Sequence, residues 1–197
     1  MIFQFHFRGA DSTFSYVVAT SESHDAIIVD PLEECIDDYA ALFEPLGYTP
    51  RFTLETGAVP KAALAAAYLG AKWRTTSVVP ADLFRSGAPL RVAHRDRLRL
   101  VGLNVEVIGR PGGPARAVSY RIGDRVFVGS RQVRDESELL ALPSDLLVYR
   151  SQLIRGTHFG LLGLEAGSAL IDRDRNWSRS VSRSTAGDAR RALPRSA

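Results

Sequence analysis

The sequence predicts a single α/β domain, and two observations carry that prediction. Stretches in which apolar and polar residues alternate, a pattern typical of strands, are interspersed with stretches whose apolar residues recur at helical spacing. No internal repeat or Gly/Ser-rich linker divides the 197 residues before position 178. We therefore expect one domain over residues 1–177 and a basic, Ser/Arg-rich, disordered tail over residues 178–197.

The chain opens with strand-like sequence. The run from Ile2 to Phe7 has phenylalanine at every second position, which places these rings on one face of a half-buried strand. Phe14–Ala19 and Ala26–Val29 follow as short β-branched runs separated by polar turn sequence, so a three-stranded meander is expected. Further strands are expected at Arg51–Glu55, Arg97–Val101, Val105–Ile108, Val118–Ile122, Arg125–Gly129 and Leu146–Tyr149.

Three helices are expected between these strands. The first runs from Leu32 to Leu46, with acidic residues in its opening turns that complement the helix dipole, and Gly47 follows its end. The second starts at Pro60 and is closed by Gly70, because proline suits the first helical position and glycine the position after the last. A short third helix is expected near Glu136–Leu142.

The net charge of +3 and the pI of about 9.3 suggest a basic protein until the charges are assigned to positions. Residues 178–197 hold five arginines and one aspartate, a balance of 5 − 1 = +4. The other 177 residues then carry 20 basic and 21 acidic side chains, a balance of −1. The domain is therefore close to neutral, and the basic signal belongs to the tail.

The remaining composition favours an ordinary cytoplasmic protein. The chain has a single cysteine, Cys35, so no disulfide can form within it, and the neighbouring acidic residues disfavour a reactive thiolate. The first residues lack a charged leader followed by a long apolar run, so no signal peptide is expected. No apolar run approaches the length needed to cross a bilayer, and no membrane contact is expected.

Motifs that carry chemistry are absent. The sequence contains no G-x-S-x-G elbow, no phosphate-binding loop and no G-x-G-x-x-G fingerprint. The four histidines are scattered at spacings that would not direct two imidazoles at one metal ion. They are His6, His24, His94 and His158.

The order of the segments nevertheless resembles the metallo-β-lactamase fold superfamily, nearest to its glyoxalase II and persulfide dioxygenase branch. The matching segments span about residues 12 to 150 in the family's order. They include Ser12–Tyr16, Ile27–Pro31, Phe52–Thr56, Arg95–Leu100, Gly102–Ile108, Arg110–Pro114, Val118–Tyr120, Gly123–Gly129, Leu142–Asp145 and Val148–Tyr149. The resemblance implies an αβ/βα sandwich, in which two mixed sheets lie face to face with helices outside.

The same resemblance implies that the family's metal centre is missing. After a threonine the family carries H-x-H-x-D-H, and its further ligands lie in a T-P-G-H loop, an F-T-G-D segment and a V-Y-P-x-H segment. No usual ligand for zinc or iron stands at any corresponding position of this chain. These positions are Gly57, Val59, Lys61, Ala62, Gly113, Ser130 and Gln152. The family's substrate-contacting insertion is also missing between Ser130 and Leu142.

These losses predict a protein without cofactor, metal or catalytic residues that keeps the fold of a family of metal-dependent hydrolases and sulfur dioxygenases. Such a pseudoenzyme would act by binding, as a partner subunit, a regulator or a scaffold, with a protein partner or a second copy of itself.

Two alternatives remain open. A metal-independent enzyme or anion-binding protein could hold a small oxyanion such as phosphate, sulfate or carboxylate in a repurposed pocket beside a glycine-rich loop. Its candidate side chains are Lys61, Arg110, Arg116, Arg131 and Arg150. The arginine tail could attract nucleic acid electrostatically, although the absence of interleaved aromatic residues argues against this partner.

One apolar stretch falls beyond the well-matched region. It comprises Phe159–Leu164 and Ala169–Ile171. The sequence is compatible with a terminal helix that covers the sandwich and with a subunit contact.

Overall fold

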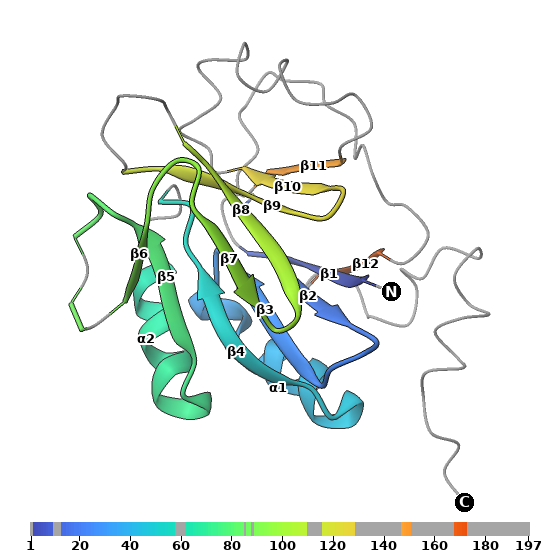
Figure 1. Cartoon of the computed structure of the whole chain (residues 1–197). Helices are drawn as coiled ribbons and strands as arrows, with labels where there is room; N and C mark the ends of the chain where they lie inside the picture. Colours follow the sequence, from blue (N-terminus) through green and yellow to red (C-terminus); the bar gives the residue numbers. More distant parts are fainter. Residues whose placement is uncertain are drawn as a thin grey trace, which may run out of the picture.

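Two mixed β-sheets lie face to face in the computed structural model of the chain, with two α-helices on the outer side of the larger sheet (Figure 1). The structure describes residues 2–9, 13–57, 62–84, 86–87, 89–109, 116–128, 147–150 and 168–172. The larger sheet has seven strands in the order β12-β1-β2-β3-β4-β5-β6, and the smaller has five in the order β11-β10-β9-β8-β7.

Along the chain, the two described helices lie on either side of the fourth strand of the seven-stranded sheet. Its strands are β1 (Ile2–Arg8), β2 (Phe14–Thr20), β3 (Asp25–Val29), β4 (Thr49–Leu54), β5 (Thr76–Pro80), β6 (Leu90–Val92) and β12 (Ser168–Asp172). A 3₁₀ turn over Glu33–Cys35 leads into α1 (Ile36–Leu46), and α2 (Ala62–Trp73) connects β4 to β5. β1, β2 and β3 form the expected antiparallel meander, whereas β3, β4, β5 and β6 are parallel.

The five-stranded sheet consists of two hairpins and one parallel strand. Its strands are β7 (Arg97–Leu100), β8 (Leu103–Gly109), β9 (Val118–Ile122), β10 (Arg125–Val128) and β11 (Leu147–Arg150). β11 is parallel to β10, and the other neighbours are antiparallel.

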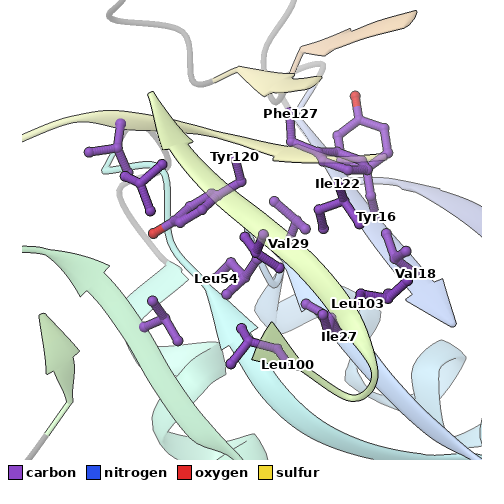
Figure 2. Packing of buried hydrophobic residues seen from close by; sticks show 14 of the residues in the cluster. Tyr16, Val18, Ile27, Val29, Leu54, Leu100, Leu103, Tyr120, Ile122 and Phe127 are labelled. Carbon is purple, nitrogen blue, oxygen red and sulfur yellow. The ribbon is translucent and has the colours of Figure 1, made fainter. Parts of the chain in front are cut away.

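Apolar side chains form two cores, one on each face of the larger sheet. The first lies between the two sheets and includes Val29, Leu54, Tyr120 and Phe127 (Figure 2). The second lies between the larger sheet and the helices, where Ile28 meets residues of α1 and α2. Neighbouring residues of β3 therefore point into different cores, as the period of a strand dictates.

The predicted fold class is confirmed, and the predicted strands agree with the observed ones to within two residues. The predicted end of the second helix is wrong: α2 continues through Gly70 to Trp73, and Arg74 then adopts the left-handed conformation with φ +58°. Its backbone N–H still donates to the carbonyl oxygen of Gly70 at 2.9 Å, so a non-glycine residue ends this helix.

Three strands were not predicted, namely β5, β6 and β12. The third rules out a helix over Ala169–Ile171, one of the two alternatives left open for this stretch, because Ser168–Asp172 is a strand that pairs in parallel with β1. The short helix expected at Glu136–Leu142 and the stretch Phe159–Leu164 lie outside the described residues. Neither described helix combines the length and the apolar composition that crossing a bilayer requires.

Candidate functional site

The edge at which β3 and β4 end is the candidate site, because parallel neighbours bring the residues after them together. Asp30 follows β3 and is fully buried in a left-handed conformation with φ 47°. Its two carboxylate oxygens both accept hydrogen bonds from Thr56, at 2.8 Å from the backbone N–H and at 2.7 Å from the hydroxyl. A buried carboxylate is thereby supplied with two donors, which lowers the free energy of the ionised form.

Two further hydrogen bonds tie this edge to the smaller sheet. The backbone N–H of Val118, the first residue of β9, donates to the carbonyl oxygen of Thr56 at 3.0 Å. The hydroxyl of Tyr120 donates to the carbonyl oxygen of Glu55 at 3.0 Å. Burial first, and then the nearby carboxylates of Asp30 and Glu55, raise the pKa of Tyr120 well above its usual value. Tyr120 therefore remains a hydrogen-bond donor at any physiological pH.

Gly57 lies against the backbone just before β9. It has φ +85°, a conformation that side-chain-bearing residues rarely adopt. A Cβ atom added here would lie 2.2 Å from the carbonyl oxygen of Arg116 and 3.3 Å from Cα of Ala117. Backbone therefore fills the space that a side chain at position 57 would need.

The structure describes four of the eleven candidate site positions, two former ligand positions and two arginines of the anion-binding alternative. Gly57 packs against the backbone of Arg116, whereas Ala62 is buried at the start of α2, in the core beneath the helices. The side chain of Arg116 is exposed. Arg150 ends β11, and its side chain is not described. The other positions lie outside the described residues: Val59, Lys61, Arg110, Gly113, Ser130, Arg131 and Gln152.

The described residues of this edge do not fit a metal ion. Gly57 and Ala62 offer no side-chain donor atom, and both oxygens of Asp30 already accept hydrogen bonds from Thr56. Across the part of the chain that the structure describes, no group of three or more His, Cys, Asp or Glu residues could hold a metal ion.

A second buried polar group lies between the sheets and was missed from the sequence. His6 of β1 packs edge-on against Tyr16 of β2 and Tyr149 of β11, with ring centroids 5.2 and 5.3 Å apart. Nε2 of Gln4 lies 2.7 Å from Nε2 of His6 and, as an amide nitrogen, can only donate to an unprotonated imidazole nitrogen. Burial, followed by the positive charge of Arg125, lowers the pKa of His6 to about 4.

The hydrogen-bond network at Asp30 could be predicted from the sequence in part, whereas the contacts of His6 could not. Asp30 and Thr56 each follow a predicted strand, and that placement was the available signal for their contact. His6 carries no such signal, because it occupies an ordinary alternating position of β1 and gains its partners only when the sheets pack.

The chain has the metallo-β-lactamase fold. Two mixed sheets pack face to face, helices lie outside the larger sheet, and the candidate site lies where β3 and β4 end. No model of a protein family matches the chain, and no curated protein matches it.

Solved structures provide the comparisons. ETHE1 from Myxococcus xanthus is similar with a TM-score of 0.67 and 24% identity, over 77% of this chain and 76% of that one. A metallo-β-lactamase from Staphylococcus aureus is similar with a TM-score of 0.64 and 15% identity, over 77% of this chain and 55% of that one. TTHA1623, solved in a di-iron-bound form, is similar with a TM-score of 0.55 and 22% identity. The match covers 74% of this chain and 90% of that one.

Proposed function

We propose that this chain is a non-catalytic protein of the metallo-β-lactamase fold that acts by binding and holds no metal ion at the edge formed by β3 and β4. The observation that carries the proposal is the contact between Gly57 and the backbone of Arg116, which leaves no room for a ligand side chain at the first expected position. A similar structure, TTHA1623, was solved with two iron ions, so the fold itself is compatible with a metal centre. The difference lies in the residues of this chain.

The residues that remain at this edge support a structural role. Asp30, Thr56, Glu55, Val118 and Tyr120 satisfy one another through hydrogen bonds and connect the two sheets. This network uses both carboxylate oxygens of Asp30 and the backbone carbonyl oxygens of Glu55 and Thr56 to hold the two sheets together at this edge. Cys35 is buried and is the only cysteine, which supports the cytoplasm as the location.

Metal analysis of the purified full chain tests this proposal. After incubation with Zn²⁺ or with Fe²⁺ under anaerobic conditions and removal of free metal, we expect far less than one metal ion per chain. The midpoint of thermal unfolding should be the same with the metal and with a chelator, because a ligand that binds only the folded state raises that midpoint. One bound ion per chain that is lost in the Asp30→Asn variant would refute the proposal.

The anion-binding alternative is tested separately. Titration calorimetry with phosphate, sulfate and acetate on the wild-type chain and on Lys61→Ala would reveal such a pocket. We expect no binding tighter than millimolar in either protein. Tighter binding that Lys61→Ala weakens would favour the repurposed pocket over a purely structural edge.

A further inference from the structure

The outer face of the smaller sheet differs between its two ends. On β10, Val126 and Val128 point outward and are nevertheless fully buried. β7 is the last of the described strands at the other end of this sheet. It carries Arg97 and Arg99 on its outer face, because Leu98 between them packs against the core. Both arginines are exposed, Arg97 with 82% of its side chain, so the outer face is open to solvent at β7.

The backbone of β7 presents hydrogen-bonding groups at this edge. β7 and β8 are joined by a two-residue turn with positive φ at both positions. Such a turn is closed by a hydrogen-bonded pair, here Leu100 and Leu103. Hydrogen-bonded and non-hydrogen-bonded pairs alternate along an antiparallel ladder, so the backbone N–H and C=O groups of Arg97 and Arg99 point away from β8. A row of this kind is a template for a further strand.

The side chains at this edge carry an excess of positive charge. Glu106 of β8 lies between Arg97 and Arg121 of β9, with a nitrogen–oxygen distance of 3.8 Å to each. Arg99 instead faces the neutral Asn104 across the hairpin. Two guanidinium groups therefore share one carboxylate and a third faces none, a balance of 3 − 1 = +2.

This charge favours one kind of partner for the edge. A second copy of the chain would set the arginines of one β7 against those of the other, and like charges opposite one another are destabilising. Single-stranded nucleic acid binds by stacking its bases on aromatic side chains. Among the described residues of β7, β8 and β9, none of the outward-facing side chains is aromatic. An acidic peptide segment meets neither objection.

We propose that β7 binds an extended peptide segment in which acidic and apolar residues alternate, as a sixth strand of the smaller sheet. Main-chain hydrogen bonds hold the segment, and its acidic side chains pair with Arg97 and Arg99. Residues two apart along a strand are separated by about 7 Å, so the two rows of charges match in spacing. The apolar residues of the segment extend the row of Leu98, which is only half-buried.

The inference deepens the proposed function and rests on it in one respect, namely that the chain acts by binding. It supplies the class of partner. Whether the edge formed by β3 and β4 holds a metal ion is measured without any peptide, so the two proposals can fail independently.

Fluorescence anisotropy on the full chain, with a labelled octapeptide of alternating valine and glutamate, provides the first test. A peptide of the same composition with its glutamates contiguous has the same charge but places carboxylates on both faces. We expect the contiguous peptide to bind about 10-fold more weakly or worse. Arg99→Glu should weaken binding of the alternating peptide about 10-fold or more, because repulsion replaces attraction. Lys72→Glu, at an exposed position of α2, makes the same change in net charge and should bind as the wild type does.

Two results of these titrations would overturn the proposal. The first is equal binding of the alternating and the contiguous peptide, or binding that Arg99→Glu leaves unchanged. The second is an oligothymidylate that binds more tightly than the alternating peptide and is weakened by Arg99→Glu, which would make this edge a nucleic-acid surface.

Methylation of the peptide's backbone nitrogens tests the added strand itself. Methyl groups at every second residue remove the hydrogen-bond donors along one edge of the peptide and leave every charge in place. Two such patterns exist, and only one edge of the peptide can face β7. At least one of the two methylated peptides should therefore lose binding. If both bind as well as the parent peptide, the attraction is electrostatic alone and no strand is added.

Discussion

At the residue scale, Gly57 leaves no room for a side chain at the position where the resemblance places the first metal ligand of the family. A histidine at this position would have to displace the backbone of Arg116 and Ala117 and also adopt φ +85°. The backbone around position 57 therefore disfavours any side chain there, whatever its chemistry. The sequence shows the glycine but not the obstruction, because the obstructing residues lie 59 and 60 positions further along the chain.

A pair of glycine substitutions separates the energetic cost of the left-handed backbone at Gly57 from the cost of the close contact with Arg116. Gly57 and Gly102 have similar conformations, with φ +85° and +81°, but a Cβ at Gly102 would meet nothing within 4 Å. Gly102→Ala should therefore lower the free energy of unfolding by about 1 to 2 kcal/mol, the cost of the left-handed backbone alone. Gly57→Ala should lower it by at least about 3 kcal/mol, because overpacking adds to that cost. Urea unfolding measures both, and equal losses would contradict the close contact.

The hydroxyl of Thr56 provides a second test at the residue scale. Thr56→Val keeps the shape of the side chain but removes the donor to the buried carboxylate of Asp30. A hydrogen bond to a charged group contributes about 1.5 to 3 kcal/mol, so unfolding should become easier by that amount in urea. Thr53→Val is the control, since its hydroxyl bonds the neutral Ser77 hydroxyl and should contribute less. A smaller effect at Thr56 than at Thr53 would contradict the assigned network.

His6 makes stability depend on pH in a defined window. Its pKa falls from 6.5 to about 4 on folding, so between these values the unfolded chain binds a proton that the folded chain does not. The contribution of His6 to the free energy of unfolding is fully present above pH 6.5. It is lost as the pH falls towards 4, by about 3 kcal/mol in all. His6→Phe should flatten the slope of unfolding free energy against pH in this window relative to wild type. Identical slopes in the two proteins would show that His6 titrates normally.

At the scale of elements, the sequence predicted the strands whose side chains alternate clearly and missed those defined by their neighbours. β6 has three residues, and β5 ends in a proline, so neither shows a convincing period of two. β5 pairs in parallel with β4 and is covered by α2, and β6 in turn pairs in parallel with β5. α2 itself extends beyond its glycine because tertiary contacts at Leu69 and Trp73 outweigh the local signal.

The hairpin between β7 and β8 turns through Val101 and Gly102, both with positive φ. This conformation favours asparagine at the first position and strains a β-branched residue, yet Val101 also packs against the core between the sheets. Val101→Asn relieves the strain at the expense of that contact and should raise stability by roughly 0.5 kcal/mol. Val101→Ala loses the contact without gaining a preferred conformation and should lower stability. Differential scanning calorimetry distinguishes them, and a less stable asparagine variant would contradict the strain.

At the scale of the whole molecule, the charge of the tail is separable from the fold. Removal of residues 178–197 changes the net charge from +3 to −1 and removes no described element. The thermal unfolding midpoint should therefore stay the same, while any association with DNA at low salt should disappear, because such binding depends on phosphate neutralisation. Gel-shift and calorimetric measurements on the two forms check both points. Unchanged DNA association after truncation would place the basic surface within the domain.

The pairing of β1 with β12 has a consequence for synthesis of the chain. Gln4 is aligned with Ser168, so the second strand of this pair is made 164 residues after the first. At about 5 to 20 residues per second, β1 waits roughly 8 to 30 s for its partner. During that interval the nascent sheet presents an open edge to other chains, including those on neighbouring ribosomes. Slow translation of the middle of the message should therefore increase aggregation of this protein in cells.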